Sequence, residues 1–133
     1  MRATVFDSYA VLGLFFEEPC AQRVEALLAE ASAASQPVQM TAVNWAEVLY
    51  RMERQRGDEG LATAKRFGAT MPLEVVPADL GLAELAAAYK ATNKLSLADA
   101  FAAALAKQKK AELVTGDNEF KAVEGEIKIE WLR

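Results

Sequence analysis

The chain of 133 residues contains no histidine, and this absence removes whole classes of chemistry. A Ser-His-Asp triad, a histidine general base and a histidine-ligated zinc or iron site are all excluded. The single cysteine, Cys20, cannot form an internal disulfide, and without a histidine partner it is a poor candidate nucleophile. We interpret it as a small residue on a helix face. Any chemistry must therefore depend on carboxylates, hydroxyls or lysines.

The sequence also lacks a long hydrophobic run and an excess of positive charge. Its longest uncharged apolar run spans the nine residues 8–16, whereas a membrane-spanning helix needs roughly 20. The first residues do not show a signal-peptide pattern. We therefore expect a cytoplasmic protein without a membrane partner. The 15 Lys and Arg against 19 Asp and Glu give a formal charge of −4, so any contact with nucleic acid must be local.

What the chain has is ample core material in an alternating order of strands and helices. Hydrophobic residues make up 53% of the sequence, and a length of roughly 100–150 residues is typical of one domain, so we expect a single domain over residues 1–133. The pattern predicts strands at 3–6, 38–40, 73–76, 112–115 and 127–131. Alternation with helices predicts an α/β fold, a parallel sheet with helices on both faces.

The helices between these strands carry recognisable start signals. Asp7 and Ser8 follow the first strand, Asn44 precedes a helix over 45–54 that Gly57 ends, and a second helix fits 58–69. Further helices are predicted near 24–31, after Asp79, and from Ser96 to about residue 109. Ligands of such folds bind beyond the carboxyl ends of the strands.

Four carboxylates occupy positions that this architecture brings together: Asp7, Glu47, Asp99 and Asp117. Asp7 and Asp117 follow the first and fourth predicted strands, and Glu47 and Asp99 lie in first turns of predicted helices. Each has an ordinary explanation alone, as a helix cap, a first-turn acid or a turn residue. Several anions in one cleft repel one another unless a cation neutralises them. Hard oxygen ligands of this kind select Mg²⁺ or Mn²⁺.

The acids lie within four sequence motifs in a fixed order. The motifs are Val5-Phe6-Asp7-Ser8, Thr41-Ala-Val-Asn-Trp-Ala-Glu47-Val, Leu95-Ser-Leu-Ala-Asp99-Ala-Phe-Ala-Ala and Leu113-Val-Thr-Gly-Asp117-Asn-Glu-Phe120. With these motifs the chain resembles, nearly from end to end, the PIN domain family, and within it the VapC-type ribonuclease toxins of toxin-antitoxin pairs. Each motif alone is weak, and the four in this order and spacing are specific.

The resemblance implies a three-layer fold with a parallel five-stranded sheet and a Mg²⁺- or Mn²⁺-dependent endoribonuclease. It implies that Asp7, Glu47, Asp99 and Asp117 hold the metal and act in catalysis. Glu119 falls where many relatives carry a further, more variable acid. Ser8 and Thr115 match hydroxyl positions beside the quartet, which suggests bonds to the metal ligands. The resemblance further implies an RNA substrate, a homodimer and an antitoxin protein whose C-terminal segment occupies a groove between the early helices.

Other functions remain open at this point. A phosphotransfer receiver needs an acidic pair after the first strand, and a haloacid-type phosphatase needs an aspartate two residues after its nucleophile; this chain has Ser8 and Tyr9 there. Both enzyme classes are excluded. A PIN nuclease for RNA processing and a binding module whose acids are only structural remain as alternatives. A flap nuclease needs an additional insertion for which 133 residues leave no room.

Basic and aromatic residues give weaker signals about binding. We expect most of the basic residues to lie on solvated helix faces, with any of them a candidate for phosphate contact: Lys90, Lys94, Lys107, Lys109, Lys110, Lys121, Arg51, Arg54 and Arg56. The apolar residues Phe15, Phe16, Trp45 and Tyr50 we interpret as core rather than interface.

Overall fold

The computed structural model describes residues 2–133 and contains a five-stranded sheet in which all pairings are parallel. The strands are β1 (Thr4–Phe6), β2 (Val38–Thr41), β3 (Leu73–Val76), β4 (Glu112–Thr115) and β5 (Ile129–Trp131). Their order across the sheet is β3-β2-β1-β4-β5, so the first strand is the central one. The predicted α/β fold with a parallel five-stranded sheet is confirmed.

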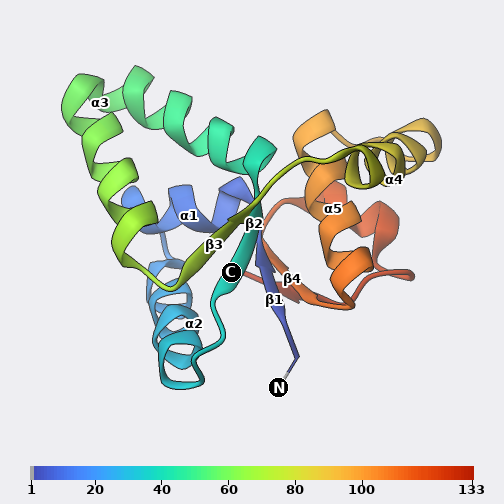
Figure 1. The fold of residues 1–133 in the computed structure, drawn as a ribbon, viewed down its shortest axis with the longest axis horizontal. Coiled ribbons are helices and arrows are strands. Elements are labelled where there is room, and N and C mark those ends of the chain that lie inside the picture. Colours follow the sequence, from blue (N-terminus) through green and yellow to red (C-terminus); the bar gives the residue numbers. More distant parts are fainter. Residues whose placement is uncertain (1) are drawn as a thin grey trace.

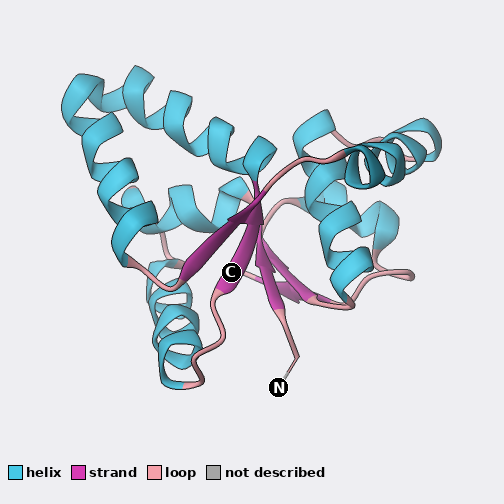
Figure 2. Cartoon of the chain, in the orientation of Figure 1, coloured by secondary structure: helices cyan, strands magenta, loops and turns pink. Residues whose placement is uncertain are grey.

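Helices cover both faces of this sheet (Figure 1, Figure 2). The helices are α1 (Ser8–Phe15), α2 (Ala21–Ala33), α3 (Ala42–Thr70), α4 (Leu80–Thr92) and α5 (Leu97–Lys109), followed by the short 3-10 helix η1 (Asn118–Val123). In Figure 1, α1, α2 and α3 lie on one side of the strands and α4 and α5 on the other. Among residues 2–133, none of the helices is long and apolar enough to cross a bilayer.

Alternation of side chains along the central strands creates two hydrophobic cores. Val5 and Leu113 point into the core beneath α4 and α5, whereas their neighbours Phe6 and Val114 point into the core beneath α1, α2 and α3. All four side chains are fully buried. Because successive residues of a strand face opposite sides, even a three-residue strand such as β1 anchors both layers.

Most predicted helix starts are confirmed, and one is wrong. Asp7, Asp79 and Ser96 cap α1, α4 and α5 as expected. The cap of α3 is Thr41 and not Asn44, because the Thr41 hydroxyl accepts the backbone N–H of Asn44 at 3.0 Å. The helix therefore begins three residues earlier than predicted.

Gly57 interrupts α3 as the sequence indicates. Its φ of +65° and ψ of −153° break the helical path, and helical residues resume directly after it and continue to Thr70. Glycine adopts positive φ without the steric cost that a Cβ adds. The two halves of α3 consequently form the bent arm at the upper left of Figure 1.

Candidate active site

The central strands β1 and β4 end side by side, and this places Asp7 and Asp117 at one edge of the sheet. Phe6 pairs with Val114 in parallel register, so β1 and β4 end at the same edge of the sheet. Asp7 then caps α1, with its Oδ1 accepting the Ala10 N–H at 3.0 Å. Asp117 caps η1, with its Oδ1 accepting the Glu119 N–H at 2.9 Å. The ordinary role as a helix cap therefore coexists with a position at the predicted site.

Thr115 joins these two acids. Its hydroxyl donates to Asp7 Oδ2 at 2.5 Å and accepts the Asp117 N–H at 3.0 Å. Asp7 and Thr115 are both essentially buried, so the bond between their side chains does not compete with water. The hydroxyl thus fixes the orientation of one carboxylate and the backbone of the other.

Glu47 reaches the site from α3 with the help of Ser8. The Ser8 hydroxyl donates to Glu47 Oε1 at 2.6 Å. The sequence predicts Glu47 in the first turn of its helix. Because α3 begins at Ala42, Glu47 lies in the second turn instead. The side chain of Glu47 therefore reaches the site from the second turn of α3. The N-terminal backbone groups of α3 lie one turn before it.

Asn44 connects the two helices that carry Glu47 and Asp99. It is fully buried, and its side-chain amide donates to the backbone oxygen of Ala98, the residue before Asp99, at 3.1 Å. The residue type of Asn44 predicts only a helix cap, not this role. No local pattern distinguishes the two roles, because the partner lies 54 positions away along the chain.

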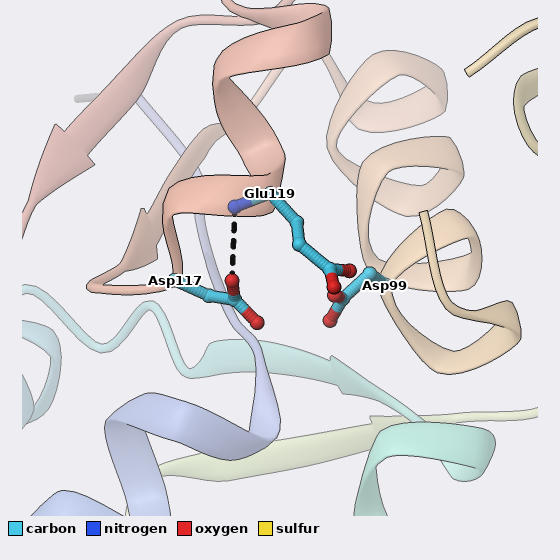
Figure 3. A group of neighbouring side chains, drawn as sticks. All are labelled: Asp99, Asp117 and Glu119. Carbon is cyan, nitrogen blue, oxygen red and sulfur yellow. Dashed lines mark hydrogen bonds between the residues drawn. The ribbon is translucent and has the colours of Figure 1, made fainter. Parts of the chain in front are cut away.

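The tightest acidic group consists of Asp99, Asp117 and Glu119. One carboxylate oxygen of each lies within 4.8 Å of those of the other two, and Figure 3 shows all three side chains converging from α5 and the start of η1. The Glu119 carboxylate also accepts the Ser96 N–H at 3.3 Å, and this bond connects η1 to the start of α5. The variable acid of the sequence analysis is thus a full member of the cluster, while Asp7 and Glu47 lie outside this closest triad.

Crowding and burial hold protons on two of these carboxyls. Burial raises the pKa of Asp7 from 3.8 to about 7, and the charges of Asp117 and Glu47 add to this effect against the hydrogen bonds from Thr115 and Ala10. Burial also raises the pKa of Asp99 from 3.8 to about 8, followed by the effects of Glu119, Asp117 and Asp7. Without a cation, the site therefore holds protons at neutral pH.

These acids line a cavity of about 510 Å³. Residues from α1, α3, α5 and η1 form its walls, among them Asp7, Ser8, Tyr9, Glu47, Arg51, Asp99, Asp117 and Glu119. Arg51 is the one basic residue that lines it among the described residues. It follows Glu47 by one helical turn.

The other basic residues lie elsewhere. Arg54 stacks over the ring of Tyr50 at 4.9 Å, and Arg56 stacks over Phe16 at 5.1 Å. Lys107 and Lys109 lie in the last turn of α5, roughly 12–15 Å along the helix axis from Asp99 at 1.5 Å per residue. Of the basic candidates, Arg51 is therefore the one that the fold brings into the cavity of the acids.

A comparison with protein families decides the classification. The model of the PIN domain matches residues 4–126, nearly the whole chain. The chain belongs to the PIN domain family. A comparison with curated protein sequences gives no significant match.

Solved structures of similar fold agree with this classification. VapBC2 of Rickettsia felis, bound to a promoter DNA fragment, matches this PIN domain with a TM-score of 0.76 at 15% identity, over 98% of this chain and 99% of the other. DNA-bound VapBC of Salmonella typhimurium matches with 0.72 at 21% identity, over 98% of both chains. The Mycobacterium tuberculosis toxin VapC20, described as cleaving the sarcin-ricin loop, matches with 0.70 at 18% identity, over 91% of this chain and 95% of the other. At these identities the likeness shows the fold.

Proposed function

We propose that this PIN domain is a Mg²⁺- or Mn²⁺-dependent endoribonuclease and the toxin of a VapBC-type toxin-antitoxin pair. One observation carries the proposal. The carboxylates of Asp7, Glu47, Asp99 and Asp117, together with Glu119, line one cavity at the carboxyl ends of the central strands. With Glu18, six acids line this cavity, and such crowding is unfavourable for the apo fold unless the acids serve a cation.

The donor set fits a hard divalent cation. Asp99, Asp117 and Glu119 offer three carboxylate oxygens within 4.8 Å of one another, and within residues 2–133 no sulfur or imidazole ligand joins this group. Mg²⁺ and Mn²⁺ prefer such oxygens. When bound, the ion would polarise a phosphate oxygen of the substrate. It would also lower the pKa of a bound water molecule, so that a hydroxide nucleophile is available near neutral pH. Asp7 and Glu47 would complete or orient this set.

The chain's own residues would then organise an attack by water on a phosphodiester. A carboxylate of Asp99 or Asp117 orients the water, since either projects into the cavity. Ser8 and Thr115 hold Glu47 and Asp7 in place by their hydroxyls. Arg51 offers a guanidinium to a phosphate of the substrate. Attack by water in line with the leaving oxygen would give 5′-phosphate and 3′-hydroxyl ends.

The toxin role, the RNA substrate and the partners rest on relatives. The similar structures include VapBC toxin-antitoxin proteins, and one is a toxin described as cleaving the sarcin-ricin loop. We therefore propose structured RNA as the substrate class, a cognate antitoxin and a homodimer. An apolar groove between α1, α2 and the end of α3, lined by Leu14, Leu28, Phe67 and Met71 among others, is the candidate surface for the antitoxin's segment.

Incubation of the purified protein with structured RNA, in Mn²⁺ or in EDTA, tests the proposal. We expect cleavage in Mn²⁺, none in EDTA, and products with 5′-phosphate ends. Asp99→Asn should abolish cleavage, whereas Asp79→Asn, which exchanges the cap of α4 at a residue that does not line the cavity, should not. Cleavage that survives EDTA, or products with cyclic phosphates, would refute the metal-dependent mechanism, because attack by the RNA 2′-hydroxyl needs no metal.

A second readout does not depend on finding the correct RNA. Mn²⁺ should raise the melting temperature of the wild type, since it binds the folded state alone, and should do so far less in Asp99→Asn. Equal stabilisation of both proteins would show that the acidic cluster does not hold the ion. It would favour the alternative of a binding module whose acids are structural.

A further inference from the structure

Tyr9 is a large aromatic residue that the site leaves unburied. It follows Asp7 and Ser8 at the start of α1 and lines the same cavity as the acids. Its side chain is 43% exposed, among the most exposed large hydrophobic residues of the chain. Within residues 2–133 its hydroxyl makes no hydrogen bond and its ring no aromatic pair. Neither core packing nor an internal polar contact accounts for its position.

One edge of the ring nevertheless packs closely against Gly116. A Cβ built on Gly116 would lie 2.4 Å from Cε1, 2.5 Å from Cζ and 2.7 Å from the hydroxyl oxygen of Tyr9. The ring edge therefore lies directly against the backbone of Gly116, at a distance that a larger residue would prevent. Because Gly116 precedes Asp117, this contact sets the ring at a defined position relative to the acidic cluster.

An exposed ring held beside a phosphodiester-cleaving site has an evident ligand. RNA is read mostly where its bases are unstacked, and such bases stack on aromatic side chains. The α3 wall of the same cavity carries Arg51, the basic residue suited to a phosphate. An aromatic surface and a guanidinium at one cavity match the alternating base and phosphate of a single strand.

We propose that Tyr9 is the stacking platform for a nucleobase next to the scissile phosphate, and that it positions the RNA strand over the acids. The inference rests on the proposed ribonuclease function. Tyr9 acts here as a positioning residue through its ring, so its hydroxyl is dispensable. Gly116 contributes by leaving space for the ring.

Binding of a fluorescent RNA tests this inference without cleavage. The probe is an octa-adenylate RNA with one central 2-aminopurine, whose fluorescence falls when it stacks, titrated with protein in Ca²⁺, which also prefers oxygen ligands. We expect wild type and Tyr9→Phe to quench the probe with affinities within twofold of each other. Tyr9→Leu should lose the quenching and bind about tenfold more weakly, in line with stacking on one base.

Two further variants separate stacking from a change of fold. Gly116→Ala should weaken quenching by displacing the ring, and should have no additional effect in Tyr9→Leu. Tyr50→Leu is the matched control, because Tyr50 is 44% exposed on α3 but does not line the cavity; it should bind like the wild type. The melting temperature in Ca²⁺ should be the same for Tyr9→Leu and Tyr9→Phe.

The possible failures are distinguishable. If Tyr9→Leu quenches and binds like the wild type, or if Tyr9→Phe loses as much as Tyr9→Leu, the ring is not a stacking platform, while cleavage by the wild type in Mn²⁺ leaves the ribonuclease function intact. If the wild type neither binds the probe nor cleaves structured RNA, the proposed function and the role of Tyr9 are both wrong.

Discussion

Replacement of Asp7 by asparagine removes a charge that the fold holds at a cost. The pKa of Asp7 rises from 3.8 to about 7, first because the carboxyl is buried. The folded protein thus retains this proton more strongly than the unfolded chain does. The free energy of unfolding therefore falls as the pH rises from about 4 to about 7, and it changes no further through this group at higher pH.

The size of the effect follows from the pKa difference. At about 1.4 kcal/mol per unit, the metal-free wild type loses about 4 kcal/mol through Asp7 at pH 8, but only about 1.5 kcal/mol at pH 5. Asparagine keeps the cap, since its Oδ1 can still accept the Ala10 N–H. Its amide cannot accept the Thr115 hydroxyl, which costs about 1–3 kcal/mol.

Asp7→Asn should therefore be about as stable as the wild type at pH 5 and about 2 kcal/mol more stable at pH 8. Urea unfolding in EDTA at the two pH values measures this difference. RNA cleavage by the variant in Mn²⁺ should be abolished, because the proposed ligand is lost.

Asp79→Asn is the control for this experiment. Asp79 caps α4 with the same bond, from the Leu82 N–H at 2.9 Å, but it is exposed. Its replacement should change stability equally little at both pH values. If the gap between Asp7→Asn and the wild type does not grow from pH 5 to pH 8, burial of Asp7 does not hold the proton and the reasoning is wrong. An unfolded variant whose folded fraction cleaves normally would make Asp7 a cap only.

Two further outcomes are expected. Thr115→Val removes the hydroxyl that donates to Asp7 and accepts the Asp117 N–H. In urea unfolding it should lower the free energy of unfolding by about 1–3 kcal/mol, and in RNA assays it should reduce cleavage. A variant that cleaves at the wild-type rate would contradict an orienting role for this hydroxyl. Sedimentation of the protein alone at micromolar concentration should give the mass of a dimer, and a monomeric mass would contradict the proposed homodimer. A standard interface of this kind buries roughly 800 Å² per partner.

The strands and most helix caps follow from local sequence, because alternation and capping are local properties. Thr41 and Asn44 show where this stops. Both are cap residues by type, but the Asn44 side chain accepts the Thr41 hydroxyl and donates to the distant Ala98 oxygen. The position of Glu47 in its helix was misjudged for the same reason.

The order of the four acids along the sequence predicts that they meet beyond the strand ends, but it does not predict their arrangement within the cavity. Glu119 joins Asp99 and Asp117 through η1, a short 3-10 helix that the sequence pattern did not predict. Tyr9 carries no sequence signal of its own, since its ring lies against Gly116, a residue distant in the sequence.

The central position of β1 has a consequence for synthesis of the chain on the ribosome. This strand is synthesised before the other four, yet one of its two partners, β4, begins at Glu112. A nascent chain that ends before this residue leaves one edge of β1 unpaired and lacks Thr115 and Asp117. Pairing over such a sequence separation is slow to form. The acidic cavity can therefore assemble only after β4 and Asp117 have been synthesised, and translation products that end before them would carry no complete site.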